Sequence, residues 1–158
     1  SNATYTLTPS LSGYTFSPAS RSVTVNGANV ADVNFTGAQD SNGGTQTYTN
    51  ANNVTIYDHY AVISPITVSG RTGNAAASTP VAVDIKHTFR GDLKVDLVAP
   101  DGSVYVLKNY NSYDSADNVI GTANVNLSSE ALNGTWRLRV SDNWFGDTGY
   151  IDSWSITF

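Results

Sequence analysis

The second half of the chain alternates apolar and polar residues with a period of two, which is typical of β-strands with one buried face. Residues 81–89 place Val, Val, Ile, His and Phe at the odd positions and Ala, Asp, Lys and Thr at the even ones. The segments 93–97, 136–140 and 154–158 alternate in the same way. No long window repeats its apolar positions every 3.6 residues, as a helix would. The pattern predicts an all-β fold, with several short strands in a sandwich or jelly roll.

The first part of the chain shows a weaker form of this pattern. Residues 4–8 alternate, residues 22–25 alternate up to the turn signal Asn26-Gly27, and residues 30–35 predict a further strand. We expect three or four short strands between residues 4 and 37. So short a segment is marginal for a hydrophobic core of its own.

A polar stretch separates the two parts. Residues 38–47 (AQDSNGGTQT) have almost no apolar content and predict a flexible linker. This places a short N-terminal β segment at residues 4–37 and the main domain at residues 48–158. Residues 1–3 (SNA) are typical of a remnant left by tag removal, and we expect the chain to be a fragment of a longer protein.

The charge and the composition exclude several classes of function. Charged residues make up 13% of the chain, against about 25% in an average soluble domain, and the net charge is −5. This acidic balance argues against nucleic acid as a partner, because nucleic-acid binding needs clustered Lys and Arg. Without Cys there are no disulfides and no thiolate metal sites. No stretch of 18 apolar residues is present, so no membrane-spanning helix is expected.

Five segments of the main domain carry motifs of one known family. They are ISPITV at 63–68, HTFRGDL at 87–93, LVAPDGS at 97–103, NGTWRL at 133–138 and DTGYIDSWSI at 147–156. In this order they resemble the P domain (P/Homo B domain) of bacterial secreted kexin-like and subtilisin-like serine proteases. The resemblance implies a jelly-roll β-sandwich of about eight strands. It also implies that the protein is extracellular. In the polypeptide, the domain is expected to follow directly after the catalytic domain of a serine protease or, less often, of a metalloprotease.

The N-terminal segment carries a separate resemblance. Residues 13–18 (GYTFSP) and 30–35 (VADVNF) are similar to the last strands of a carboxypeptidase-regulatory-like or Ig-type repeat. The first strands of such a repeat are missing here. A truncated repeat leaves an unpaired strand edge, and exposed edges invite pairing between chains. We therefore expect either a monomer or a weak dimer through residues 4–37.

Catalytic chemistry is not expected from this chain. A serine protease needs a nucleophile, a base within hydrogen-bond reach and an orienting acid, and no GxSxG or HExxH motif is present. His87 falls on the apolar face of its predicted strand, so we interpret it as a structural histidine, and His59 falls in a polar loop. A hydrolase built on two of the aspartates stays open as an alternative, although nothing singles out one pair.

Four residues of the family motifs are the candidates for a structural or interdomain role: Arg90, Asp92, His87 and Trp154. The sequence Arg90-Gly91-Asp92 spells an adhesion tripeptide, but it lies between two predicted strands inside the family motif. We therefore expect Arg90 and Asp92 to form a structural pair or to contact the protease domain. Calcium is the one cofactor that the sequence favours, because its ligands are carboxylate and carbonyl oxygens. Asp58, Asp92 and Asp147 are the preferred ligands, and the alternative is that these aspartates form turns.

The first functional hypothesis follows from the resemblance. The chain is expected to be a non-catalytic accessory domain that packs on the catalytic domain of its own protease and stabilises or regulates it. The alternative is a module that binds protein or carbohydrate surfaces. It rests on the aromatic loop residues Tyr110, Tyr113, Trp144 and Phe145, since aromatic rings stack on sugars, although the same rings could anchor their loops to the core.

Overall fold

The computed structural model describes residues 2–11, 14–39 and 44–158. It contains thirteen β-strands and one short 3-10 helix within these ranges. The chain divides into an N-terminal unit, Ser1–Gly44, and a C-terminal unit, Thr45–Phe158. Among the described residues no helix is long and apolar enough to cross a membrane. Because all of the regular secondary structure in the described ranges is strand, except for the short 3-10 helix, the all-β prediction is confirmed.

The N-terminal unit consists of two small antiparallel sheets. β1 (Ala3–Leu7) pairs with β3 (Arg21–Val25), and β2 (Tyr14–Ser17) pairs with β4 (Thr36–Gln39). The strand expected at residues 30–35 is wrong: these residues form no strand, and the strand begins at Thr36 instead. Asp32 has a φ of 60°, which lies in the left-handed region and interrupts an extended run.

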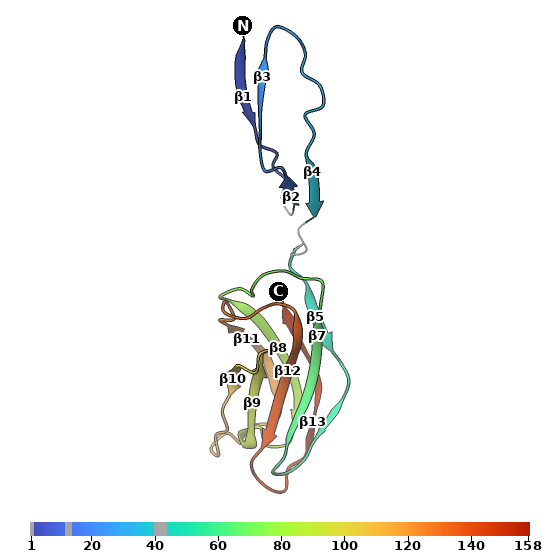
Figure 1. Ribbon diagram of the computed structural model, residues 1–158. Helices are drawn as coiled ribbons and strands as arrows, with labels where there is room; N and C mark the ends of the chain where they lie inside the picture. Colours follow the sequence, from blue (N-terminus) through green and yellow to red (C-terminus); the bar gives the residue numbers. More distant parts are fainter. Residues whose placement is uncertain (1, 12–13, 40–43) are drawn as a thin grey trace. The chain divides into compact units, whose positions relative to one another are not determined.

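The C-terminal unit is a two-layer antiparallel sandwich of nine strands (Figure 1). One sheet has the order β10-β9-β12-β7; the other has the order β11-β8-β13-β5, with β6 also paired to β13. The strands are β5 (Thr47–Asn50), β6 (Val54–Ile56), β7 (Ala61–Val68), β8 (Thr79–His87), β9 (Leu93–Val98), β10 (Val104–Lys108), β11 (Val119–Val125), β12 (Gly134–Asp142) and β13 (Gly149–Thr157). The 3-10 helix η1 (Arg90–Asp92) joins β8 to β9.

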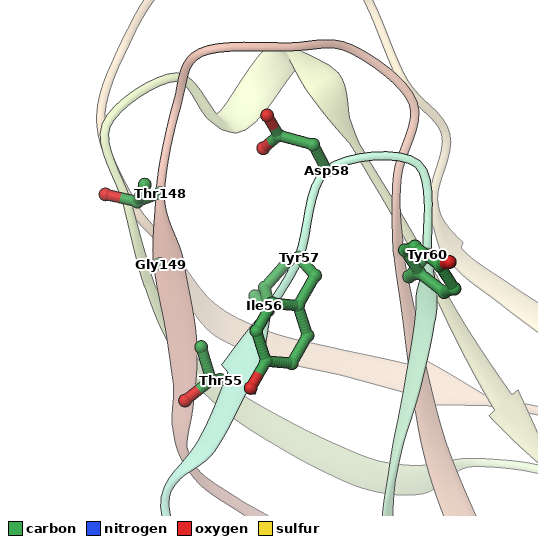
Figure 2. A pocket seen from close by; sticks show the side chains of 7 residues that line it. All are labelled: Thr55, Ile56, Tyr57, Asp58, Tyr60, Thr148 and Gly149. Carbon is green, nitrogen blue, oxygen red and sulfur yellow. The ribbon is translucent and has the colours of Figure 1, made fainter.

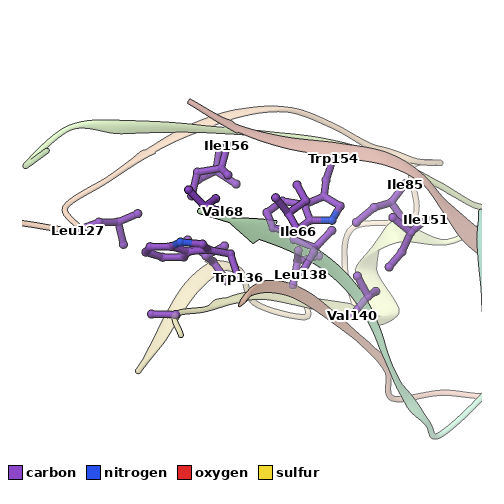
Figure 3. Close-up of a cluster of buried hydrophobic side chains, with 14 of the residues drawn as sticks. Ile66, Val68, Ile85, Leu127, Trp136, Leu138, Val140, Ile151, Trp154 and Ile156 are labelled. Carbon is purple, nitrogen blue, oxygen red and sulfur yellow. The ribbon is translucent and has the colours of Figure 1, made fainter. Parts of the chain in front are cut away.

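The core lies between the two sheets and follows the alternation in the sequence (Figure 3). Leu138 of β12 and Ile151, Trp154 and Ile156 of β13 are almost completely buried. A register shift between Ile151 and Ser153 lets β13 bury residues three apart before the period of two resumes. The Trp154 indole donates a hydrogen bond to the Ser64 hydroxyl at 3.1 Å, which satisfies the polar atom of a buried ring.

The expected linker at residues 38–47 overlaps both units. Residues 40–43 of this stretch lie outside the described residues. On one side, β4 extends through residue 39 and pairs with β2. On the other, Gln46 exchanges two backbone hydrogen bonds with Phe158, directly before β5. The polar segment therefore contributes to strand pairing at both of its ends.

Candidate functional site at one end of the sandwich

Four connections meet at one end of the C-terminal unit, which we call the acidic pole. They are the β6–β7 turn (57–60), the β8–β9 connection with η1 (88–92), the β10–β11 loop (109–118) and the β12–β13 loop (143–148). Figure 1 shows these connections at the end of the unit opposite the C-terminus. Most of the candidate residues from the sequence lie here, because strands that run in alternate directions bring distant connections to the same end of a sandwich.

Arg90 binds the β10–β11 loop rather than its neighbour in the tripeptide. Its Nε donates to both carboxylate oxygens of Asp114, at 3.0 and 2.9 Å. This hydrogen bond is the main reason that the pKa of Asp114 lies below its usual value. The expected structural pair of Arg90 and Asp92 is thus replaced by a pair of Arg90 and Asp114, a partner 24 residues away that the sequence did not reveal.

Gly91 lets the β10–β11 loop approach the tripeptide closely. A Cβ atom at this position would overlap the backbone carbonyl oxygens of Asn111 and Asp114. The backbone N–H of Asn111 donates to the carbonyl of Gly91 at 2.7 Å. Glycine therefore allows the β10–β11 loop to pack directly on η1. Gly91 and Asp92 are both buried, and this places the tripeptide within the packing of the unit.

The Lys108 ammonium group closes the same junction from β10. Its Nζ donates to the carbonyl oxygens of Arg90 at 2.6 Å, Leu93 at 3.1 Å and Asn109 at 3.1 Å. Burial lowers the pKa of this lysine, because a low-dielectric environment disfavours the charged form. Lys108 thus ties together the end of η1, the start of β9 and the start of the β10–β11 loop.

His87 forms a buried pair with Asp142. Its Nε2 lies 3.1 Å from Oδ2 of Asp142, and its Nδ1 lies 3.0 Å from the carbonyl oxygen of Phe89. The other oxygen of Asp142 accepts a hydrogen bond from the backbone N–H of Trp144 at 3.1 Å. Within the described residues neither ring nitrogen contacts a hydroxyl group, so the pair lacks the nucleophile of a catalytic triad. It connects β8 to the end of β12, a long-range contact that sequence reasoning missed.

The three candidate calcium ligands all lie at the acidic pole. Asp58 accepts a hydrogen bond from the backbone N–H of Gly146 at 3.1 Å, and Asp147 accepts one from the Thr88 hydroxyl at 2.7 Å. The pKa of Asp92 is raised, first by burial and then by the nearby charges of Asp142 and Asp147. Within the described part of the chain, no three His, Cys, Asp or Glu side chains are grouped closely enough to hold a metal ion. Calcium binding by these residues stays a prediction.

Exposed aromatic side chains lie on the same connections as the carboxylates. An open groove of about 840 Å³ runs beside the β6–β7 turn, and Tyr57, Tyr60 and Asp58 line it together with Thr148 (Figure 2). Phe145 of the β12–β13 loop packs edge-on against the ring of His59, with the ring centroids 4.0 Å apart. The pole therefore combines aromatic surface with negative charge.

Comparison with known proteins assigns the chain to a family. The proprotein convertase P-domain family model matches residues 76–158 of this chain. The chain belongs to this family. The resemblance stated from the sequence motifs is thereby confirmed for the P domain. The Ig-type resemblance of residues 4–37 stays a prediction.

Two relatives of this chain are proteins of Streptomyces species. Leupeptin-inactivating enzyme 1 of Streptomyces exfoliatus is 58% identical over 115 residues, which cover 72% of this chain and 26% of the relative. The transglutaminase-activating metalloprotease of Streptomyces mobaraensis is 45% identical over 127 residues, 80% of this chain and 17% of the relative. The matched part of the chain thus spans about a quarter or less of the length of these relatives.

A solved structure supports the fold of the P domain. A serine protease of Aeromonas sobria matches with a TM-score of 0.57 at 21% identity, over 72% of this chain and 27% of that chain. At this level of identity the likeness shows the architecture alone. The P domain therefore has the same sandwich as one part of a larger protease.

Proposed function

We propose that residues 48–158 form a non-catalytic accessory domain of a secreted serine endopeptidase, which packs on the catalytic domain of the same polypeptide and stabilises it. The match of residues 76–158 to the P-domain family carries this proposal. The His87–Asp142 pair supports it, because its ring nitrogens are engaged with Phe89 and Asp142 and no nucleophile lies beside them in the described structure.

The physical basis of stabilisation is burial of surface between the two domains. A contact made only by the folded catalytic domain raises the free energy needed to unfold that domain. Interfaces between domains of one chain are of moderate size and contain apolar surface. A stabilising P domain should therefore present apolar side chains that its own core does not use.

The outer face of the β10-β9-β12-β7 sheet presents such side chains. Ile63 of β7 and Val104 and Val106 of β10 are about half exposed. Between them, Asp96 is buried, and its Oδ2 accepts hydrogen bonds from Arg139 at 2.7 Å and Lys94 at 3.1 Å. This network holds the long cationic side chains flat on the sheet. We propose this face as the contact with the catalytic domain.

The test compares the catalytic domain of the parent protease with and without the fused P domain. We expect the fused form to keep its activity longer at elevated temperature. Replacing both Ile63 and Val106 by Ser should shorten that half-life toward the value of the catalytic domain alone. Ile120→Ser is the matched control, since Ile120 is also exposed but lies on the other sheet. Equal half-lives with and without the P domain would contradict the proposal.

A further inference from the structure

The net charge of the C-terminal unit is concentrated at the acidic pole. Its four connections, counted together with the bordering residues Lys108 and Asp142, contain six acidic and two basic residues. Their net charge is −4. The acidic residues are Asp58, Asp92, Asp114, Asp117, Asp142 and Asp147. Residues 45–158 as a whole carry eleven acidic and seven basic residues, also −4. The remainder of the unit therefore carries no net charge.

The two cations of the pole are already used internally. Arg90 is paired with Asp114, and Lys108 is partly buried and bonded to three carbonyl oxygens. Asp117 is exposed, and Asp58 and Asp147 accept hydrogen bonds from neutral donors. Their negative charges are thus available to an external cation.

The exposed aromatic rings of the unit gather at the same pole. Among the described residues of the C-terminal unit, seven aromatic side chains are exposed, and six of them lie on the connections of the pole. The six are Tyr57, Tyr60, Tyr110, Tyr113, Trp144 and Phe145. Tyr113 is 95% exposed and Phe145 is 78% exposed. Rings so exposed add nothing to the core, and Tyr, Trp and Phe are enriched in protein interfaces.

The connections that carry these rings are held in place by hydrogen bonds. Asp58 binds the backbone of Gly146, which joins the β6–β7 turn to the β12–β13 loop. Asn143 donates its backbone N–H to the carbonyl of Asp92 at 3.1 Å, which joins that loop to η1. The Arg90–Asp114 pair joins η1 to the β10–β11 loop. A surface that is ordered before binding loses less conformational entropy when a partner docks.

We propose that the acidic pole is a docking surface for a separate protein that presents Lys and Arg side chains in an extended segment. Cations stack favourably on the faces of Tyr, Trp and Phe rings, and carboxylates among the rings add ion pairs. A surface that carries both features matches Lys and Arg side chains better than neutral or acidic ones. The pole is also separate from the outer sheet face proposed above for the catalytic domain, so the two proposals can fail independently.

Trp144 provides a direct probe of this surface. Trp136 and Trp154 are buried in the core, whereas Trp144 is 53% exposed at the pole. Quenching of tryptophan fluorescence by acrylamide therefore reports on Trp144. The whole 158-residue chain is titrated with a Lys-Gly repeat peptide, with a Glu-Gly repeat peptide of equal length and with soluble cellulose oligosaccharides. Chelator is present throughout, so that no divalent cation neutralises the aspartates.

We expect the Lys-Gly peptide alone to protect Trp144. Its affinity should fall at least about tenfold between low salt and 0.5 M NaCl, because mobile ions screen the charges. Phe145→Ala and Tyr113→Ala should each weaken binding by about fivefold or more, as loss of an interface aromatic typically does. Asp117→Asn should weaken it as well, while Asp152→Asn and Ile120→Ala, on the outer face of the other sheet, should not. Equal protection by the Glu-Gly peptide, protection by the oligosaccharide or no protection by any probe would overturn the proposal.

Discussion

The two units use the same alternation of apolar and polar residues but reach different degrees of burial. In the C-terminal unit, eighteen apolar residues form one buried core between a four-stranded and a five-stranded sheet. In the N-terminal unit the sheets have two strands each, and no described residue is buried. The comparison shows that alternation predicts strands, whereas a core requires a second layer to cover the apolar face.

The apolar residues of the N-terminal unit illustrate the difference. Tyr5 and Leu7 of β1 and Val30 after the β3 turn are each about half exposed. They line an open groove with Val23 and Val25 of β3. The apolar residues on the inner faces of β9 and β12 are fully buried, because the sheet that contains β8 and β13 covers them. Substitutions in the two units should therefore have very different costs.

The largest expected difference comes from one substitution made in both units. Leu138→Ala in β12 removes a fully buried side chain and should lower the free energy of unfolding by about 2–5 kcal/mol. Leu7→Ala in β1 removes a side chain that is 43% exposed and should change it by less than about 0.5 kcal/mol. Urea unfolding followed by tryptophan fluorescence measures Leu138→Ala, because the three tryptophans lie in the C-terminal unit. Far-UV circular dichroism measures Leu7→Ala, because it reports on the strands of both units. Similar losses for the two variants would contradict the difference in burial between the two units.

The predicted calcium site gives the next largest effect. Binding of calcium by Asp58, Asp92 and Asp147 would stabilise the folded state by about 2.7 kcal/mol at a concentration 100 times the dissociation constant. Thermal unfolding with calcium and then with excess chelator measures it. If these aspartates hold calcium, the midpoint falls on chelation in the wild-type chain and falls less in Asp147→Asn. An unchanged wild-type midpoint would assign the three aspartates to turns and loop contacts.

A smaller effect is expected from the pH dependence of Asp92. Its pKa in the folded state is raised above the ordinary value of 3.8, mainly by burial. Between these two pKa values the folded state binds more protons than the unfolded state, so the contribution of Asp92 to stability decreases as the pH rises through this range. In the presence of chelator, the wild-type chain should lose stability relative to Asp92→Asn from pH 4 upward. A constant difference between the two chains across pH 4–8 would contradict the raised pKa.

The smallest effect is expected from removal of the N-terminal unit. Deletion of residues 1–44 should leave the unfolding midpoint of the C-terminal unit unchanged within about 2 °C, because the eighteen core residues all lie in that unit. Sedimentation at high concentration tests the predicted weak dimer in parallel. The full chain should show weak self-association, and the deleted chain should be a monomer. A full chain that stays strictly monomeric would refute dimerisation through residues 4–37.

Several features of the fold and the site could be predicted from the sequence, because they depend on local order. The alternation in residues 81–89 and 93–97 gave the buried faces of β8 and β9. Pro100 and Gly102 are turn-forming residues, and Gly102 has a φ of 100° in the structure. The motif residues His87 and Trp154, for which a structural or interdomain role was expected, are both buried. Steric limits of single residues and the period of a strand are written directly in the sequence.

Other features depend on contacts between distant residues. The Asp142 partner of His87 is 55 residues away, and the Asp114 partner of Arg90 is 24 residues away. The strand at Thr36–Gln39 forms because it pairs with β2, although residues 30–35 have the more apolar pattern. No local pattern specifies such partners, since many aspartates and many short segments are equivalent in the sequence.

The sequence by itself determined the all-β class and the apolar faces of the strands, because these follow from residue order and strand geometry. Its five motifs carried the resemblance to the P-domain family. The tertiary structure alone decided that six aspartates and six exposed aromatic rings share one end of the sandwich. It also decided that Arg90 and Lys108 are engaged within the pole. The physical reason is that antiparallel strands bring connections from distant parts of the chain to one end of the sandwich, and the charged and exposed aromatic side chains of those connections gather there.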